Sequence, residues 1–129
     1  ADGSTEVDAT IDASLYGLFA FGVYPAREEK VKQTMDQVFE QLKCGEGISR
    51  YENDLFFSQD GKTSNAWFVT TLWKAQYLIA TANNPEQLKP ALDILEWVAD
   101  HALPSGVLAE QIDPQTDVPL SVSPLAWSH

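Results

Sequence analysis

Apolar residues recur at helical spacing in four stretches of the chain. They lie three or four positions apart, which predicts helices over residues 8–23, 26–43, 65–83 and about 85–102. In 65–83 a second apolar row widens the apolar face to more than half of the circumference, which indicates a helix buried on two sides. Pro90 either lies in the first turn of a helix that begins near Lys89, or kinks a longer helix.

Two long connections separate these helices. Residues 44–63 and 103–122 are rich in turn-forming residues, and both are longer than most loops in compact domains. Ser123 and Pro124 predict the start of a fifth helix. The alternation of short turns with long loops predicts an all-α fold of antiparallel helical hairpins. Both long loops then lie at the same end, a natural place for an active site.

Composition narrows the class of protein. With 129 residues, 44% of them hydrophobic, the chain is expected to form one domain, 1–129, with its own core. A net charge of −11 disfavours nucleic-acid binding, which requires clustered Lys and Arg. No apolar run approaches the ~20 residues of a membrane span, so no membrane partner is expected. The compartment stays open: a soluble protein, either cytoplasmic or secreted.

Cysteine and histidine are scarce. Cys44 is the only cysteine, which excludes an internal disulfide and a Cys-based zinc site within this chain. The two histidines, His101 and His129, exclude a His-rich metal site. We therefore expect neither a metal nor a cofactor.

The candidate functional residues lie in the two long loops and at their edges. A carboxylate beside an amide, with a Trp close behind, suits a general base that faces a sugar. An arginine offers several fixed donors to neighbouring sugar hydroxyls. The candidates are Arg50, Tyr51, Asp54, Trp67, Glu110, Gln111 and Trp127.

Four ordered segments, 47–54, 65–68, 109–111 and 119–128, resemble glycoside hydrolase family 15, the inverting glucoamylase and glucodextranase family. The resemblance covers about residues 8–129. It implies that the chain is the C-terminal segment of an (α/α)6 toroid. It further implies hydrolysis of α-linked glucans from the non-reducing end, with inversion and release of glucose.

The resemblance also implies roles for single residues. Glu110 falls on the general base and Gln111 lies beside it. Arg50 falls on an arginine that holds sugar hydroxyls, and Trp127 on an aromatic that lines the sugar pocket. Gln111 is also counted as substrate-binding, together with three further positions of the matching motifs, Tyr51, Asp54 and Trp67. The family's proton donor has no counterpart here, so the isolated chain is expected to be inactive.

Plainer interpretations stand beside these roles. Glu110 can be an ordinary solvated acid, and Arg50 an ion-pair partner of Glu52 or Asp54. Asp54 can also cap backbone amides in its loop. The two tryptophans, Trp67 and Trp127, can belong to the core.

Two other functions remain open. The first is a non-catalytic carbohydrate-binding or regulatory relative, similar to the regulatory subunits of phosphorylase kinase. The second is a helical scaffold that binds a protein partner. The presence of Arg50, Glu110 and Gln111 favours the enzyme. The expected partners are an α-glucan or oligosaccharide, the missing N-terminal part of the barrel and, through exposed apolar faces, a second copy of the chain.

Overall fold

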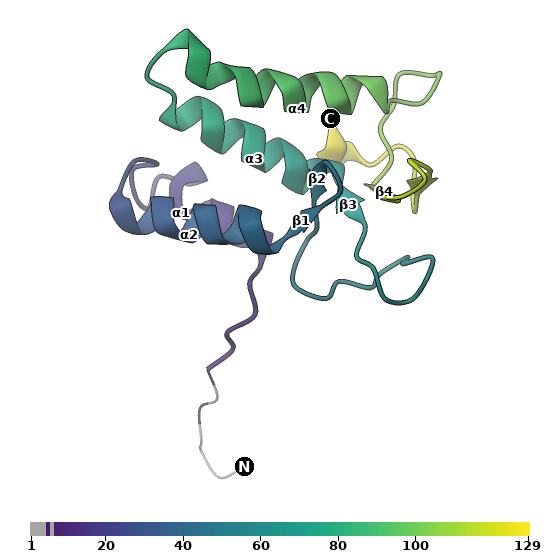
Figure 1. Cartoon of the computed structure of the whole chain (residues 1–129), viewed down its shortest axis with the longest axis horizontal. Coiled ribbons are helices and arrows are strands. Elements are labelled where there is room, and N and C mark those ends of the chain that lie inside the picture. Colours follow the sequence, from purple (N-terminus) through teal and green to yellow (C-terminus); the bar gives the residue numbers. More distant parts are fainter. Residues whose placement is uncertain (1–4, 6) are drawn as a thin grey trace.

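The computed structural model describes residue 5 and residues 7–129, and combines helices with a small sheet (Figure 1). The helical elements are η1 (Ala13–Tyr16), α1 (Gly17–Ala20), α2 (Glu29–Gln41), α3 (Phe68–Thr81), η2 (Pro85–Leu88), α4 (Lys89–Asp100) and η3 (Ala126–Ser128). The strands are β1 (Lys43–Cys44), β2 (Gly47–Ile48), β3 (Ala66–Trp67), β4 (Gln111–Ile112) and β5 (Pro119–Leu120).

The five strands form one antiparallel sheet in the order β1-β2-β3-β4-β5. The expected all-α fold, a segment of an (α/α)6 toroid, is therefore wrong. Every strand has only two residues, too few for an alternating pattern to show in the sequence. The strands lie within or beside the two connections that read as irregular loops, and β3 pairs with two segments distant in sequence, β2 and β4.

The outer helices also differ from the prediction. The first stretch forms only η1 and the four residues of α1. Asp12 caps the N-terminus of η1, and its side chain accepts a hydrogen bond from Ser14 N at 2.7 Å. Helix α3 starts at Phe68 because the two residues before it pair as β3. Pro90 lies in the first turn of α4, one of the two expected arrangements. The fifth predicted helix is wrong, since only the three-residue η3 forms there.

The first turn of α3 anchors the sheet. Thr71 Oγ1 accepts the Ile48 N–H at 3.0 Å, and Thr70 Oγ1 donates to the Ile48 carbonyl at 2.6 Å. A Cβ on Gly47 would lie 2.7 Å from the Ala66 Cβ and 2.9 Å from Thr71 Oγ1. Only glycine therefore allows β2 to approach β3 and α3 this closely.

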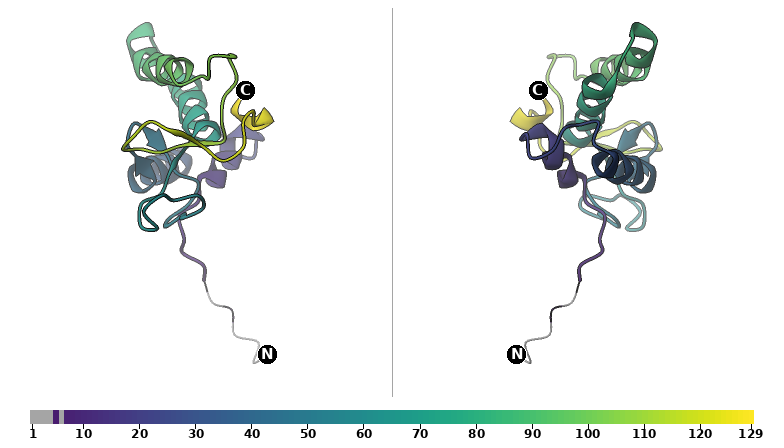
Figure 2. Two further views of the ribbon diagram at one scale, coloured as in Figure 1. Left: turned by 90° about the vertical axis from the view of Figure 1, so that its right-hand side faces the viewer. Right: turned by 90° about the vertical axis from the view of Figure 1, so that its left-hand side faces the viewer.

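Two apolar clusters flank this junction. One joins η1, α2 and α3 around Met35, Val38 and Tyr77. The other joins the sheet to α3 and α4 around Phe68, Val98 and Ile112. Figure 1 shows the connections α1–α2 and α3–α4 at one end of the molecule, and the strands with their long loops at the other. In Figure 2, residues 7–10 lead away from the packed elements.

Several apolar side chains remain exposed on the helices. Ile79, Leu92 and Leu95 are 49%, 55% and 41% exposed. Such residues are consistent with a covering partner, but the expected self-association and the single-domain assignment remain predictions. None of the helices in the described part of the chain has the length and apolar character needed to cross a bilayer.

The single thiol, Cys44, lies beside the polar loops. It is 8% exposed and its Sγ donates to the Ser64 carbonyl at 2.7 Å. Burial raises the pKa of Cys44 to about 11, and the negative charge of Asp113 acts in the same direction.

We expect iodoacetamide to alkylate the native thiol about 100-fold more slowly than an exposed thiol at about pH 8, because the thiolate is the reactive form. Equal rates for the native and the urea-unfolded chain would contradict this.

Candidate active site

The register of β4 and β5 places Ser121 opposite Glu110. Gln111 pairs with Leu120, and one step further along the ladder the Glu110 N–H donates to the Val122 carbonyl at 3.0 Å. The Ser121 hydroxyl donates to Glu110 Oε2. Ser121 has a φ of 65°, which is uncommon for a residue other than glycine. The sequence analysis missed Ser121, and the only signal that could have found it is this strand pairing.

A second donor reaches the same carboxylate from Gln111. Its Nε2 donates to Glu110 Oε2 at 3.4 Å, and its Oε1 accepts from Asn65 Nδ2 at 2.9 Å. Asn65 Nδ2 also donates to the Phe56 carbonyl at 3.3 Å. Gln111 is fully buried and Asn65 is 2% exposed. Glu110, only partly buried, thus lies at the solvent-facing end of a buried amide chain.

Arg50, Tyr51 and Asp54 form one cluster, and one of the plainer interpretations of Arg50 is confirmed. Its Nε and Nη2 donate to the two carboxylate oxygens of Asp54 at 3.0 and 3.1 Å. Nη2 also donates to the Tyr51 hydroxyl at 3.2 Å. Burial of the guanidinium tends to lower the pKa of Arg50, but the hydrogen bond and charge of Asp54 outweigh it and hold the pKa above its ordinary value.

Asp54 is the buried member of this pair. Its side chain is fully buried, whereas that of Arg50 is 37% exposed. Asp54 Oδ1 also accepts the Phe56 N–H at 3.1 Å, so the carboxylate shapes its own loop as well as orienting the arginine. This geometry fixes the guanidinium plane and leaves part of it open to a ligand.

Trp67 connects the two groups of predicted residues. The Arg50 guanidinium carbon lies 4.4 Å from the centre of the Trp67 ring system. The Phe56 ring stacks on Trp67, with the two ring centres 6.3 Å apart. On the strand, Trp67 pairs with Gln111. Trp67 is 5% exposed, as the core interpretation required, yet its Nε1 has no hydrogen-bond partner among the described residues.

Trp127 lies apart from these contacts. It belongs to η3 and is 76% exposed, so the interpretation of Trp127 as a core residue is wrong. Its exposed ring is available for stacking against a ligand or another surface.

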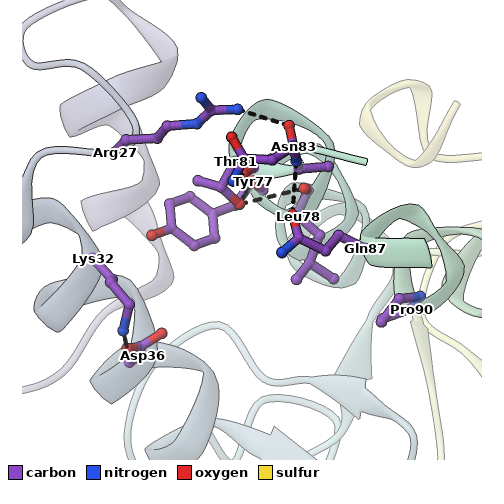
Figure 3. Close-up of a pocket in the computed structure, with 10 residues that line it drawn as sticks. Arg27, Lys32, Asp36, Tyr77, Leu78, Thr81, Asn83, Gln87 and Pro90 are labelled. Carbon is purple, nitrogen blue, oxygen red and sulfur yellow. Dashed lines mark hydrogen bonds and ion pairs between the residues drawn. The ribbon is translucent and has the colours of Figure 1, made fainter. Parts of the chain in front are cut away.

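One cavity borders the predicted site residues, and another lies apart from them. Arg50 and Tyr51 line a hollow of about 380 Å³ together with Asp12, Ser14 and Trp73. A second cavity, of about 460 Å³, lies between α2 and the C-terminal half of α3, with Arg27, Tyr77 and Gln87 in its lining (Figure 3). None of the seven predicted site residues lines the second cavity. In the part of the chain that is described, no group of three or more His, Cys, Asp or Glu is arranged to hold a metal ion.

Comparison with known sequences relates the chain to glycosidases. No protein-family model matches it. It is 29% identical over 134 residues to an uncharacterized glycosyl hydrolase of Methanocaldococcus jannaschii, covering 95% of this chain and 21% of that protein. It is 31% identical over 120 residues to a trehalase of Thermoplasma volcanium, and the match covers 92% of this chain and 18% of that trehalase. The chain thus spans about a fifth of the length of these relatives.

Solved structures agree with this relationship. A wild-type glycosidase superposes with a TM-score of 0.73 at 25% identity, over 98% of this chain and 34% of that one. A glycosidase variant with Glu replaced by Ala, in complex with glucose, superposes with a TM-score of 0.72 at the same identity and coverage. The chain is therefore a relative of glycosidases and corresponds to about a third of such a solved chain.

Proposed function

We propose that this chain supplies the general base, Glu110, to an inverting glycoside hydrolase that releases glucose from the non-reducing end of α-linked glucans. The observation that carries the proposal is the hydrogen bonding of the Glu110 carboxylate. Within the described residues, both of its hydrogen bonds, from Ser121 and Gln111, go to Oε2. This leaves Oε1 free to accept a proton from water.

In the proposed reaction, Glu110 Oε1 takes a proton from a water molecule while the water oxygen attacks the anomeric carbon. A carboxylic acid on the opposite side protonates the leaving glycosidic oxygen, and inversion follows because the attack comes from the face opposite the leaving group. We place this acid outside the 129 residues, since the chain has no counterpart of the family's proton donor.

Substrate contacts are assigned to the cluster beside the base. Arg50, oriented by Asp54 and Tyr51, would donate to sugar hydroxyls, and the rings of Trp67 and Trp127 would contact apolar sugar faces. The relationship to glycosidases, the trehalases among the relatives and the glucose-bound structural neighbour support this class of substrate. Membership of glycoside hydrolase family 15 is part of the proposal.

The deciding experiment uses the complete protein that carries these residues. Glucose release is measured from maltose, isomaltose, trehalose and soluble starch, and the anomer of the product is read by NMR. We expect β-glucose from at least one substrate, and none from the 129-residue chain alone. Retention of the α anomer at the glucose cleaved from the non-reducing end of starch, or robust turnover by the isolated chain, would contradict the proposal. Trehalose hydrolysed with inversion gives one α- and one β-glucose, so α-glucose from that substrate is expected.

An absence of turnover on all four substrates would favour the non-catalytic carbohydrate-binding or regulatory relative. That relative still binds glucan. Replacing Trp127 by Ala in the complete protein is then expected to weaken maltose or glucan binding, because its exposed ring would lose stacking on the sugar. Calorimetry that detects no sugar binding in the unsubstituted protein would leave the protein-binding scaffold instead.

A further inference from the structure

A directional chain of hydrogen bonds runs from the backbone to the Glu110 carboxylate. It begins at the Phe56 carbonyl, passes through the amides of Asn65 and Gln111, and ends at Glu110 Oε2, with distances of 3.3, 2.9 and 3.4 Å. Both amides are at least 98% buried. Bulk water therefore has little access to replace either partner.

The first member of this chain determines the orientation of the others. A backbone carbonyl only accepts hydrogen bonds, so Asn65 must turn its nitrogen, and not its oxygen, toward Phe56. The same nitrogen also faces Gln111, which must therefore present its oxygen to Asn65. The nitrogen of Gln111 is then left facing Glu110, where it matches a carboxylate that accepts.

We propose that Asn65 is a positioning residue for the general base. Asn65 directs the Gln111 donor toward Glu110 Oε2, which holds the ionised carboxylate with Oε1 toward water. This inference rests on the proposed role of Glu110. Asn65 acts only through Gln111, because Glu110 is hydrogen-bonded to Gln111 and Ser121.

The test replaces Asn65 by Asp in the complete protein. The exchange keeps the shape of the side chain and turns its donor into an acceptor. Gln111 is then expected to turn its nitrogen toward position 65 and its oxygen toward Glu110, which repels the carboxylate. We expect kcat to fall roughly 10²-fold, as for a misplaced catalytic group, with KM within about twofold because sugar contacts are untouched. The control is Asn53→Asp, the same exchange at an exposed position of the same loop, which should leave both constants unchanged.

A double-mutant cycle separates positioning from general packing. Gln111→Met removes the donor and keeps an unbranched side chain of similar size. If Asn65 acts through Gln111, Asn65→Asp in this background should change kcat by no more than about twofold. Additive losses in the double variant would overturn the proposal, as would an unchanged kcat in Asn65→Asp alone.

A measurement on the unsubstituted 129-residue chain covers the case in which Asn65→Asp does not fold. The Gln111 side-chain amide should exchange its hydrogens at least about tenfold more slowly than a free amide, because both ends are hydrogen-bonded in the interior, and Glu110→Gln should shift its NMR signals. Exchange at the free rate would overturn the inference.

The two proposals fail in different ways. If the unsubstituted protein releases no glucose and the Gln111 amide is protected, the proposed function fails and the hydrogen-bond order stands. If glucose is released and Asn65→Asp keeps the original kcat, the function stands and the positioning role fails.

Discussion

Replacing Glu110 by Gln in the complete protein is expected to lower kcat for glucoside hydrolysis by roughly 10²–10⁴-fold, the usual contribution of a general base. The amide has the shape of the carboxylate, and it can still accept the Ser121 hydrogen bond. It cannot take a proton from the attacking water. The loss should therefore appear in kcat, with KM little changed.

Stability provides the control for this variant. Glu110 is only partly buried, so Glu110→Gln should change the free energy of unfolding of the 129-residue chain by no more than about 0.5 kcal/mol. Glu46→Gln, an exposed exchange of the same type in the β1–β2 turn, should leave turnover unchanged. Unchanged turnover in Glu110→Gln would end the general-base assignment.

Replacing Arg50 by Met is expected to destabilise the chain by roughly 3 kcal/mol in urea unfolding. Methionine keeps an unbranched side chain of similar length but removes the guanidinium that lies over Trp67, and with it the charge. The Asp54 side chain, which is fully buried, is then left as an uncompensated charge, and breaking such a pair costs about 3–5 kcal/mol. We expect the lower end of that range because the Arg50 side chain is 37% exposed.

The chain contains a matched ion pair for comparison. Lys32 and Asp36 are also four residues apart, and Lys32 Nζ lies 2.6 Å from Asp36 Oδ2. Both of these side chains are 57% exposed. Lys32→Met should therefore cost less than about 1 kcal/mol, as solvent-exposed pairs do. A second substitution, Asp54→Asn in the Arg50→Met chain, should recover part of the loss because no buried charge remains. Equal losses from Arg50→Met and Lys32→Met would contradict the assignment of a buried charge.

The helices with a strong apolar period were predictable. Residues 29–41, 68–81 and 89–100 all fall inside expected helices, because each has an apolar face that packs against a neighbour. The strands were not predictable, because a two-residue strand has no period and depends on its partner. The sheet is visible only when Ile48, Trp67 and Gln111 are brought into register.

In the candidate site, too, contacts between residues close in sequence were predictable, and contacts made by strand pairing were not. Arg50 and Asp54 are four residues apart in sequence, so their ion pair could be proposed from the sequence of this loop alone. The partners of Glu110 divide in the same way: Gln111 is adjacent in sequence, whereas Ser121 reaches Glu110 through strand pairing. Asn65, which contacts Gln111, is likewise brought to the site by pairing of distant segments. Sequence patterns indicated which side chains carry chemistry, and the sheet determines which of them meet.

The pairing of β3 with β4 also limits how such a protein can change length over time. Successive residues of a strand point to opposite faces, so one residue inserted between Gln111 and Ile112 would turn the strand residue that follows it to the other face of the sheet. The same insertion at Asp60–Gly61, an exposed turn between β2 and β3, would leave the register intact. Length variation among natural homologues should therefore accumulate in the turns, while the five dipeptides of the sheet keep their length.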